Sequence, residues 1–384
     1  MSSGSFAVLA KNTMNSIGGF NKFFAACPGA LATWKKIKDR QWEAAPQPVK
    51  DQAEVYEETA FKRHLCQHKN LWVDPELGTI CSQKELAEYC HFKQDMWRMA
   101  HWGGLLPIIG GYALPLYVFW FGNNTWVPST FNSTPEQVLE WRKSQDLYRY
   151  KHAPALLAFE RWFAQYHMNI SQESGLAFDM LYDKNDVRKD PKLMRKIADG
   201  NERVFPFFRC RRKQIRCIAH AMGIPSFPMF AQINLQARIK DYWEIIWNED
   251  LIVIKGNLHQ AMSDEELQDY AWRRFMSPYD KELSRDEILR RVEDYHAYLG
   301  SSFVSEGRTP NIFITINYVM GYYNDPAYLE GDIAELDSND FDHLQSWGKD
   351  AFLKRLEFEN GPLRDQVEAH SIKSLAEREK RLAE

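Results

Sequence analysis

The sequence predicts a mainly α-helical protein, in which a helical domain follows a proline-containing membrane segment, with extensions at both ends. Capping boxes, in which Ser or Thr precedes Glu or Gln by three residues, begin at Thr134, Ser263 and Ser284. Between 288 and 299, apolar residues recur at spacings of four, three and four, as on one face of a helix. The apolar run at 251–256 is typical of a short strand, but no series of strands is present to pair with it.

Composition excludes several classes of protein. With 384 residues, the chain has room for two or three domains or for one elongated helical body. A hydrophobic content of 45% excludes wholesale disorder, and a net charge of -4 excludes a globally basic nucleic-acid binder. The mean hydropathy of -0.51 excludes a transporter with many spans. The 13 Trp, 17 Tyr and 23 Phe indicate either a well-filled core or a subunit buried in a larger assembly.

Residues 1–60 form an N-terminal extension. Its first acidic residue is Asp39, preceded by lysines and several serines, which is typical of a mitochondrial targeting segment. We expect an uncleaved targeting segment, whose aromatic stretch from Phe20 to Trp34 contacts a membrane or a partner. A solvated tail is the alternative.

Residues 61–131 combine a helix at 83–102 with the candidate membrane segment 103–121, which has no charged residue. As one helix, this segment would rise about 28 Å, close to the roughly 30 Å hydrocarbon core of a bilayer. Its prolines and four glycines break or kink helices. A membrane span, a broken and partly embedded hairpin, and a buried core helix are therefore all open interpretations.

Residues 132–323 are expected to form the helical domain, and 324–384 an acidic and highly charged C-terminal extension. The domain carries a basic run: Arg209, Arg211, Arg212, Lys213 and Arg216. Such a run indicates either a solvated helix face or a contact with RNA or anionic lipid headgroups.

Motifs for chemistry are missing from the sequence. It contains no phosphate-binding glycine loop, no nucleophile elbow and no paired zinc-ligand spacing. Two acidic segments, at 183–194 and 337–341, lack the residues that a calcium loop needs. We therefore expect no catalytic residue, no metal site and no enzyme, and we interpret the six cysteines as reduced thiols.

A colinear series of short motifs runs through this chain. It begins with Asp95-Met96-Trp97-Arg98, continues with Pro107 and Pro115, and reaches Pro128-Ser129-Thr130-Phe131. Further matches follow at 250–256, 266–274 and 288–299. This series, over about residues 90–323, resembles a degenerate form of the LETM domain family (leucine zipper, EF-hand, transmembrane) of the mitochondrial inner membrane. Gly111 stands where the family pattern has an intramembrane acidic residue, the usual candidate for moving a cation or proton.

The resemblance implies a location in the mitochondrial inner membrane, with the bulk of the chain on the matrix side. Together with the aromatic content, it predicts a non-catalytic accessory subunit of a large assembly, with ATP synthase as the first candidate and a respiratory complex as the second. The expected partners are protein subunits and cardiolipin, held by Lys93, Arg98 and the basic run, with no cofactor otherwise. Cation/proton exchange and contact with the mitoribosome or another RNA, as in the family, are the alternatives, although nucleic acid is not an expected partner.

Overall fold

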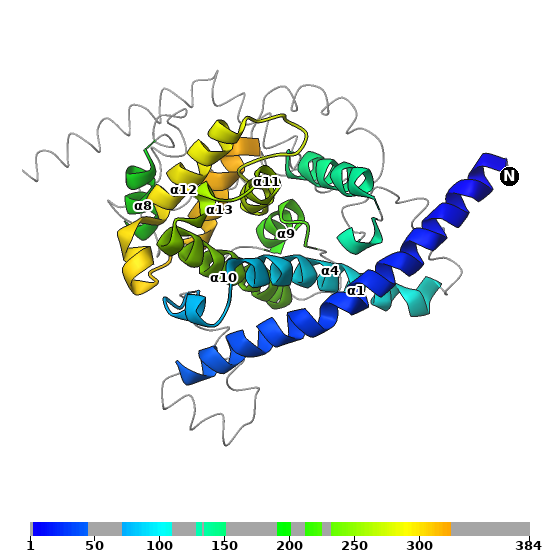
Figure 1. Cartoon of the computed structure of the whole chain (residues 1–384), viewed down its shortest axis with the longest axis horizontal. Coiled ribbons are helices and arrows are strands. Elements are labelled where there is room, and N and C mark those ends of the chain that lie inside the picture. The colour runs from blue at the N-terminus through cyan, green and yellow to red at the C-terminus, as the bar shows by residue number, and fades with distance from the viewer. Residues whose placement is uncertain are drawn as a thin grey trace, which may run out of the picture. The chain divides into compact units, whose positions relative to one another are not determined.

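The computed structural model describes residues 3–44, 71–109, 128–132, 134–150, 190–200, 212–224 and 232–323. Within these ranges the chain consists of α-helices and short 3-10 turns, with no β-strand (Figure 1). The predicted mainly α class is therefore confirmed for the described part of the chain.

The chain divides into two compact units, and each is built from separate stretches of sequence. Unit 1 comprises 1–148 and 219–310, and unit 2 comprises 149–218 and 311–384. The sequence boundaries at 60, 131 and 323 differ from this division. Composition and local pattern show where a segment changes character, but they do not show that the chain leaves a unit and later returns to it.

Unit 1 has α10 at its centre, where it packs against α4 and α12, while α1 lies across α4 and α11 packs on α12. A further helix begins at 135. The bounds of the labelled elements of unit 1 are α1 (Ser3–Glu43), η1 (Leu77–Thr79), α4 (Gln83–Ile109), η2 (Ser129–Phe131), α10 (Gln232–Gly256), η5 (Leu258–Gln260), α11 (Asp264–Arg273) and α12 (Arg285–Glu306).

Unit 2 contains α8 (Pro191–Gly200), most of α9 (Arg212–Ala221), α13 (Ile312–Met320) and η6 (Gly321–Tyr323). The α13 helix packs against α8. Arg149 donates a hydrogen bond of 2.9 Å to the Tyr323 hydroxyl, and the Tyr150 and Tyr323 rings lie 4.9 Å apart.

The predicted helix starts are confirmed. Ser263 and Glu266 form a complete capping box at α11, and Thr134 and Gln137 exchange both bonds at the helix that begins at 135. At α12 the Ser284 hydroxyl accepts the Glu287 amide, whereas the Glu287 carboxylate binds two arginines farther along the helix. Capping is decided within one helical turn, so a local pattern is sufficient to predict it.

The strand expected at 251–256 is wrong, because these residues form the last turns of α10. Leu251 and Val253 are buried against neighbouring elements. A continuous apolar run has the same composition in a buried helix and in a buried strand, so its periodicity does not distinguish them. Here the packing of α10 on both sides favours the helix.

The α1 helix is firmly docked. Phe23 stacks on Phe92 of α4 with ring centroids 5.0 Å apart. A Cβ atom at Gly19 would lie 2.7 Å from the Phe131 Cα, so glycine permits the close approach of α1 to η2. Lys36 binds Glu85 at 2.7 Å. The aromatic contact expected for the N-terminal extension therefore includes a contact with the body of the chain.

The candidate membrane segment lies largely outside the described residues. Its first part, 103–109, forms the final turns of α4, and 110–121 is not described. Among the helices that are described, none combines the length and apolarity needed to cross a bilayer.

Candidate functional site

Asp95 on α4 connects two parts of the chain that are distant in sequence. Its Oδ1 accepts the Ser129 backbone N–H at 2.8 Å. Its Oδ2 accepts the Ser129 hydroxyl at 2.8 Å and the Thr130 backbone N–H at 3.0 Å. Asp95 is 1% exposed. A buried carboxylate thus satisfies the free N–H groups at the start of η2, and we call this contact the Asp95 clamp.

Arg98 lies one helical turn after Asp95 and completes the clamp. Its Nη1 donates to Asp95 Oδ1 at 3.1 Å, and its guanidinium carbon lies 4.8 Å from the centre of the Trp141 ring. The side chain is buried, with 1% of its surface exposed. Our assignment of Arg98 to a cardiolipin headgroup is therefore corrected: its guanidinium is a core group that balances a buried carboxylate.

Lys93, the other predicted lipid contact on α4, has a different environment. Its Nζ lies 3.1 Å from a carboxylate oxygen of Asp241. The centres of the Tyr89 and Trp97 rings lie 5.9 and 5.8 Å from the same Nζ. The side chain is 16% exposed. An acidic and aromatic enclosure of this kind holds a cation, and it leaves only a small part of Lys93 facing solvent.

The clamp bounds the uncharged part of the sequence. No Asp, Glu, Lys or Arg stands between Arg98 and Glu136. The chain leaves α4 within this run and re-enters the described structure at Pro128, the residue before η2. Asp95 therefore ties the entry and the exit of the uncharged run to one buried point.

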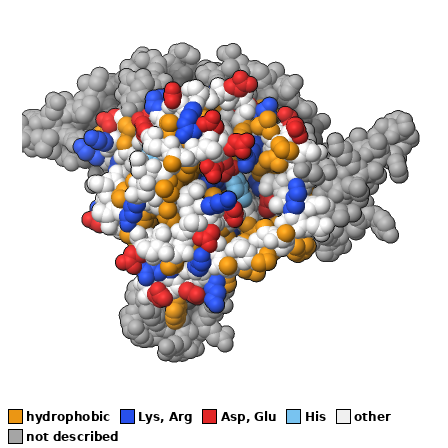
Figure 2. Space-filling model, viewed as in Figure 1, with side chains coloured by type: hydrophobic (Ala, Val, Ile, Leu, Met, Phe, Trp, Pro, Cys, Tyr) orange, Lys and Arg blue, Asp and Glu red, His pale blue; other side chains and the backbone are white. Residues whose placement is uncertain are grey.

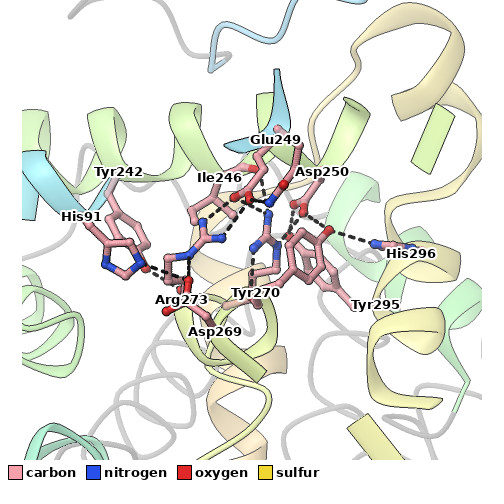
Figure 3. Close-up of polar contacts among 12 residues, drawn as sticks. His91, Tyr242, Ile246, Glu249, Asp250, Asp269, Tyr270, Arg273, Tyr295 and His296 are labelled. Atoms are coloured by element: carbon pink, nitrogen blue, oxygen red, sulfur yellow. Dashed lines mark hydrogen bonds and ion pairs between the residues drawn. The ribbon is translucent and has the colours of Figure 1, made fainter. Parts of the chain in front are cut away.

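A second polar cluster lies in the core of unit 1, between α10 and the end of α11 (Figure 3). Glu249 accepts Arg273 Nη2 at 2.8 Å and Arg274 Nη2 at 3.0 Å. Arg274 Nε also donates to Asp250 at 2.5 Å. All four residues are at most 1% exposed. Two adjacent carboxylates thus face two adjacent guanidinium groups, and we call this set the buried charge network.

The buried charge network extends to two tyrosines and a histidine. Asp250 also accepts the Tyr270 hydroxyl at 2.6 Å and the Tyr295 hydroxyl at 2.9 Å, and His296 lies 3.0 Å from the Tyr270 oxygen (Figure 3). Burial raises the pKa of Glu249, but the two guanidinium groups more than offset this and bring the pKa to about 2. Glu249 therefore remains charged near neutral pH, whereas burial raises the pKa of Asp250 above its usual value despite its bond to Arg274. Hydrogen bonds of the network join α10, α11 and α12.

On its other side, the network reaches α4 and the helix that begins at 135. Asp269 accepts Arg273 Nε at 2.9 Å, Arg142 at 2.8 Å and His91 at 3.0 Å. Gln83 at the start of α4 donates to Glu249 at 2.7 Å. Side chains from five helices thus meet around these charges. In the described part of the chain, no group of His, Cys, Asp or Glu is arranged to hold a metal ion.

A surface groove of about 670 Å³ lies beside this network. The helix that begins at 135 contributes Leu139 and Arg142 to its lining, and α11 contributes Leu267. Arg142 is already held by Asp269 and the Tyr279 hydroxyl, and Arg285 at the rim binds Asp264 at 2.5 Å. The lining of the groove therefore mixes apolar and charged side chains, and Arg142 and Arg285 are bound by other groups of the protein.

The remaining predicted residues fall into three groups. Pro128, Ser129, Thr130 and Phe131 are brought to Asp95, and Pro107 lies in the final turns of α4. Pro115, Arg209 and Arg211 are outside the described residues. Of the basic run, Arg212, Lys213 and Arg216 lie on α9, where Arg216 is half-buried.

Sequence reasoning missed the buried charge network. Arg273-Arg274 was noted only as part of a motif match, and Glu249 received no role. The available signal was the presence of two adjacent acids and two adjacent bases within otherwise buried helical turns, because buried charges need partners.

In comparisons with known proteins, no family model and no curated protein sequence matches this chain.

Proposed function

We propose that this chain is a non-catalytic accessory subunit that anchors and braces a larger assembly of the mitochondrial inner membrane. The supporting observation is the Asp95 clamp. It ties both ends of the uncharged run, which includes the candidate membrane segment 103–121, to the core of unit 1. A membrane segment that is held by a helical body suits an anchoring role and needs no catalytic group.

The use of charge in the core favours the same function. In the clamp and in the buried charge network, carboxylates are neutralised by guanidinium groups at 2.5–3.1 Å. A catalytic acid or base needs access to a substrate and a pKa near the working pH. Glu249, with a pKa of about 2 and no exposed surface, instead has the character of a structural ion.

The choice of assembly rests on the resemblance to the LETM family and on the aromatic content. ATP synthase is the first candidate and a respiratory complex is the second, with the bulk of the chain on the matrix side. Bound cardiolipin is part of the proposal. Lys93, which is partly exposed, and the basic run on and before α9 are its remaining candidate contacts, because Arg98 is buried.

Native gel electrophoresis tests this proposal. Membranes from cells that express the tagged chain are solubilised in mild detergent, and the band that contains the chain is identified by mass spectrometry. We expect co-migration at fixed stoichiometry with subunits of ATP synthase or, failing that, of a respiratory complex. A chain that migrates alone would overturn the proposal.

The activity of the resembled family provides a second arm of the test. The purified chain is reconstituted into vesicles, and proton movement is followed after a cation gradient is imposed. We expect no flux above that of empty vesicles. Cation-dependent proton flux by the chain alone would replace the structural function with an exchange activity.

A further inference from the structure

The α1 helix exposes a row of large apolar side chains beside its docked face. Phe24 is 62% exposed, Leu31 59%, Trp34 40% and Trp42 39%. At about 100° per residue these four positions fall within roughly 80° of one another, and 24 to 42 spans about 27 Å. We call them the α1 apolar stripe. Figure 2 shows hydrophobic side chains following the described part of α1 on this face.

The face of α1 next to the stripe is occupied by the body of unit 1, and Trp34 lies at the edge between the two faces, where it lines a small hollow with Trp72 and Tyr89. Phe23 packs on Phe92, and Phe23, Ala30 and Thr33 are buried. The stripe is therefore a second face of α1, and docking to the body leaves it exposed. Large apolar side chains exposed together on one helix face often mark an interaction site.

Charge indicates what binds the stripe. No carboxylate occurs in α1 before Asp39, whereas five lysines do: Lys11, Lys22, Lys35, Lys36 and Lys38. Lys35, next to Trp34, is exposed. A helix with aromatic and aliphatic residues on one face and flanking lysines is typical of an amphipathic helix that lies on an anionic bilayer. A second copy of α1 would bring lysines against lysines, which disfavours self-association through this face.

The location of α1 in the fold also favours a bilayer as the partner of the stripe. It packs on α4 and η2, the two elements that bound the uncharged run. Phe92 on α4 precedes the run, and Phe131 of η2 lies within its final part. α1 therefore packs against both described elements at the two ends of the run.

We propose that α1 lies in the plane of an anionic membrane surface, with Phe24, Leu31 and Trp34 inserted at the headgroup–acyl boundary and Lys35 among the headgroups. The inference deepens the membrane part of the proposed function. Its occupant is lipid and not the helix of a partner subunit.

Photo-crosslinking in vesicles tests the inference. The full-length chain carries benzoyl-phenylalanine in place of Leu31 and is reconstituted into phosphatidylcholine vesicles with or without cardiolipin. We expect phospholipid adducts on the α1 peptide, with a higher yield when cardiolipin is present and a lower yield in high salt. The matched control carries the probe in place of Leu147, which is 48% exposed on the helix that begins at 135, and we expect it to form few adducts.

A variant locates the adducts on the stripe. Each of Phe24→Gln and Trp34→Gln removes an exposed apolar side chain and lowers the affinity of α1 for the surface about tenfold. The double variant therefore loses the adduct at position 31. The single variant Leu147→Gln keeps it. Because these side chains are partly exposed, the unfolding midpoint of each variant is measured to verify that the fold is intact.

Two results would overturn the inference and leave the proposed function standing. One is a chain that inserts into vesicles but forms no lipid adduct at position 31. The other is a crosslink in native membranes to a protein subunit, which would show that a partner covers the stripe. Conversely, lipid adducts in vesicles from a chain that migrates alone on native gels would support the membrane contact of α1 and contradict the proposed function as a subunit of an assembly.

Discussion

Replacing Asp95 by Asn tests the clamp most directly, because the substitution preserves size and removes charge. One carboxylate oxygen becomes an NH₂ group that faces N–H or O–H donors of η2, and the buried Arg98 loses its ion pair with Asp95. Hydrogen bonds to charged groups contribute about 1.5–3 kcal/mol each, and breaking a buried ion pair costs about 3–5 kcal/mol. We expect Asp95→Asn to lower the free energy of unfolding by about 3–5 kcal/mol, a large share of the usual 5–15 kcal/mol.

Two measurements check this expectation. Urea unfolding in mild detergent, followed by near-UV circular dichroism, reports the loss of stability. Hydrogen exchange at the Ser129 and Thr130 amides reports the clamp locally, and we expect these amides to exchange faster in the variant. Asp241→Asn is the matched control. It removes the partner of Lys93 at 3.1 Å, but Asp241 is 48% exposed, so we expect a cost below about 1 kcal/mol. Equal effects of the two variants, with unchanged exchange at η2, would refute the reasoning.

Three further predictions concern the core of unit 1. Glu249→Gln leaves two buried guanidinium groups facing a neutral amide, so we expect urea unfolding to show a loss of about 3–5 kcal/mol, and a loss below about 1 kcal/mol would contradict the charged state of Glu249. Burial lowers the pKa of His296 well below 6.5. As pH falls below about 6.5, the His296 imidazole of the unfolded chain binds a proton that the folded chain does not bind. The free energy of unfolding therefore falls by up to about 1.4 kcal/mol per pH unit. We expect His296→Gln to flatten this dependence, and an unchanged slope between pH 5 and 6.5 would exclude the assignment. Gly307 has a φ of +67°, and an added Cβ would lie 2.7 Å from the Val73 carbonyl oxygen. We therefore expect Gly307→Ala to cost about 1–3 kcal/mol, whereas Gly29→Ala, with open space around it, is neutral or stabilising; similar thermal midpoints would argue against a close approach at Gly307.

The pieces of the candidate site were visible in the sequence, but their assembly was not. Asp95, Arg98 and Ser129-Thr130 were grouped because they stand in the order of a family pattern. The contact between Asp95 and Ser129 spans 34 residues of sequence, and no local rule predicts it. Arg98 was expected to hold a cardiolipin headgroup. Its burial depends on Asp95 and Trp141, which only the packing of the helices brings to it.

By itself, the sequence determined the helical class and the helix starts at 134, 263 and 284, because capping bonds form within a single turn and amphipathic spacing repeats within two. Tertiary structure decided that 251–256 is helical. It also paired Glu249 with Arg273 across 24 residues and divided the apolar residues of α1 between a docked face and an exposed stripe. These outcomes depend on burial. Whether a charge is neutralised or an apolar side chain is covered is decided by the elements that pack against it, and those come from distant parts of the chain.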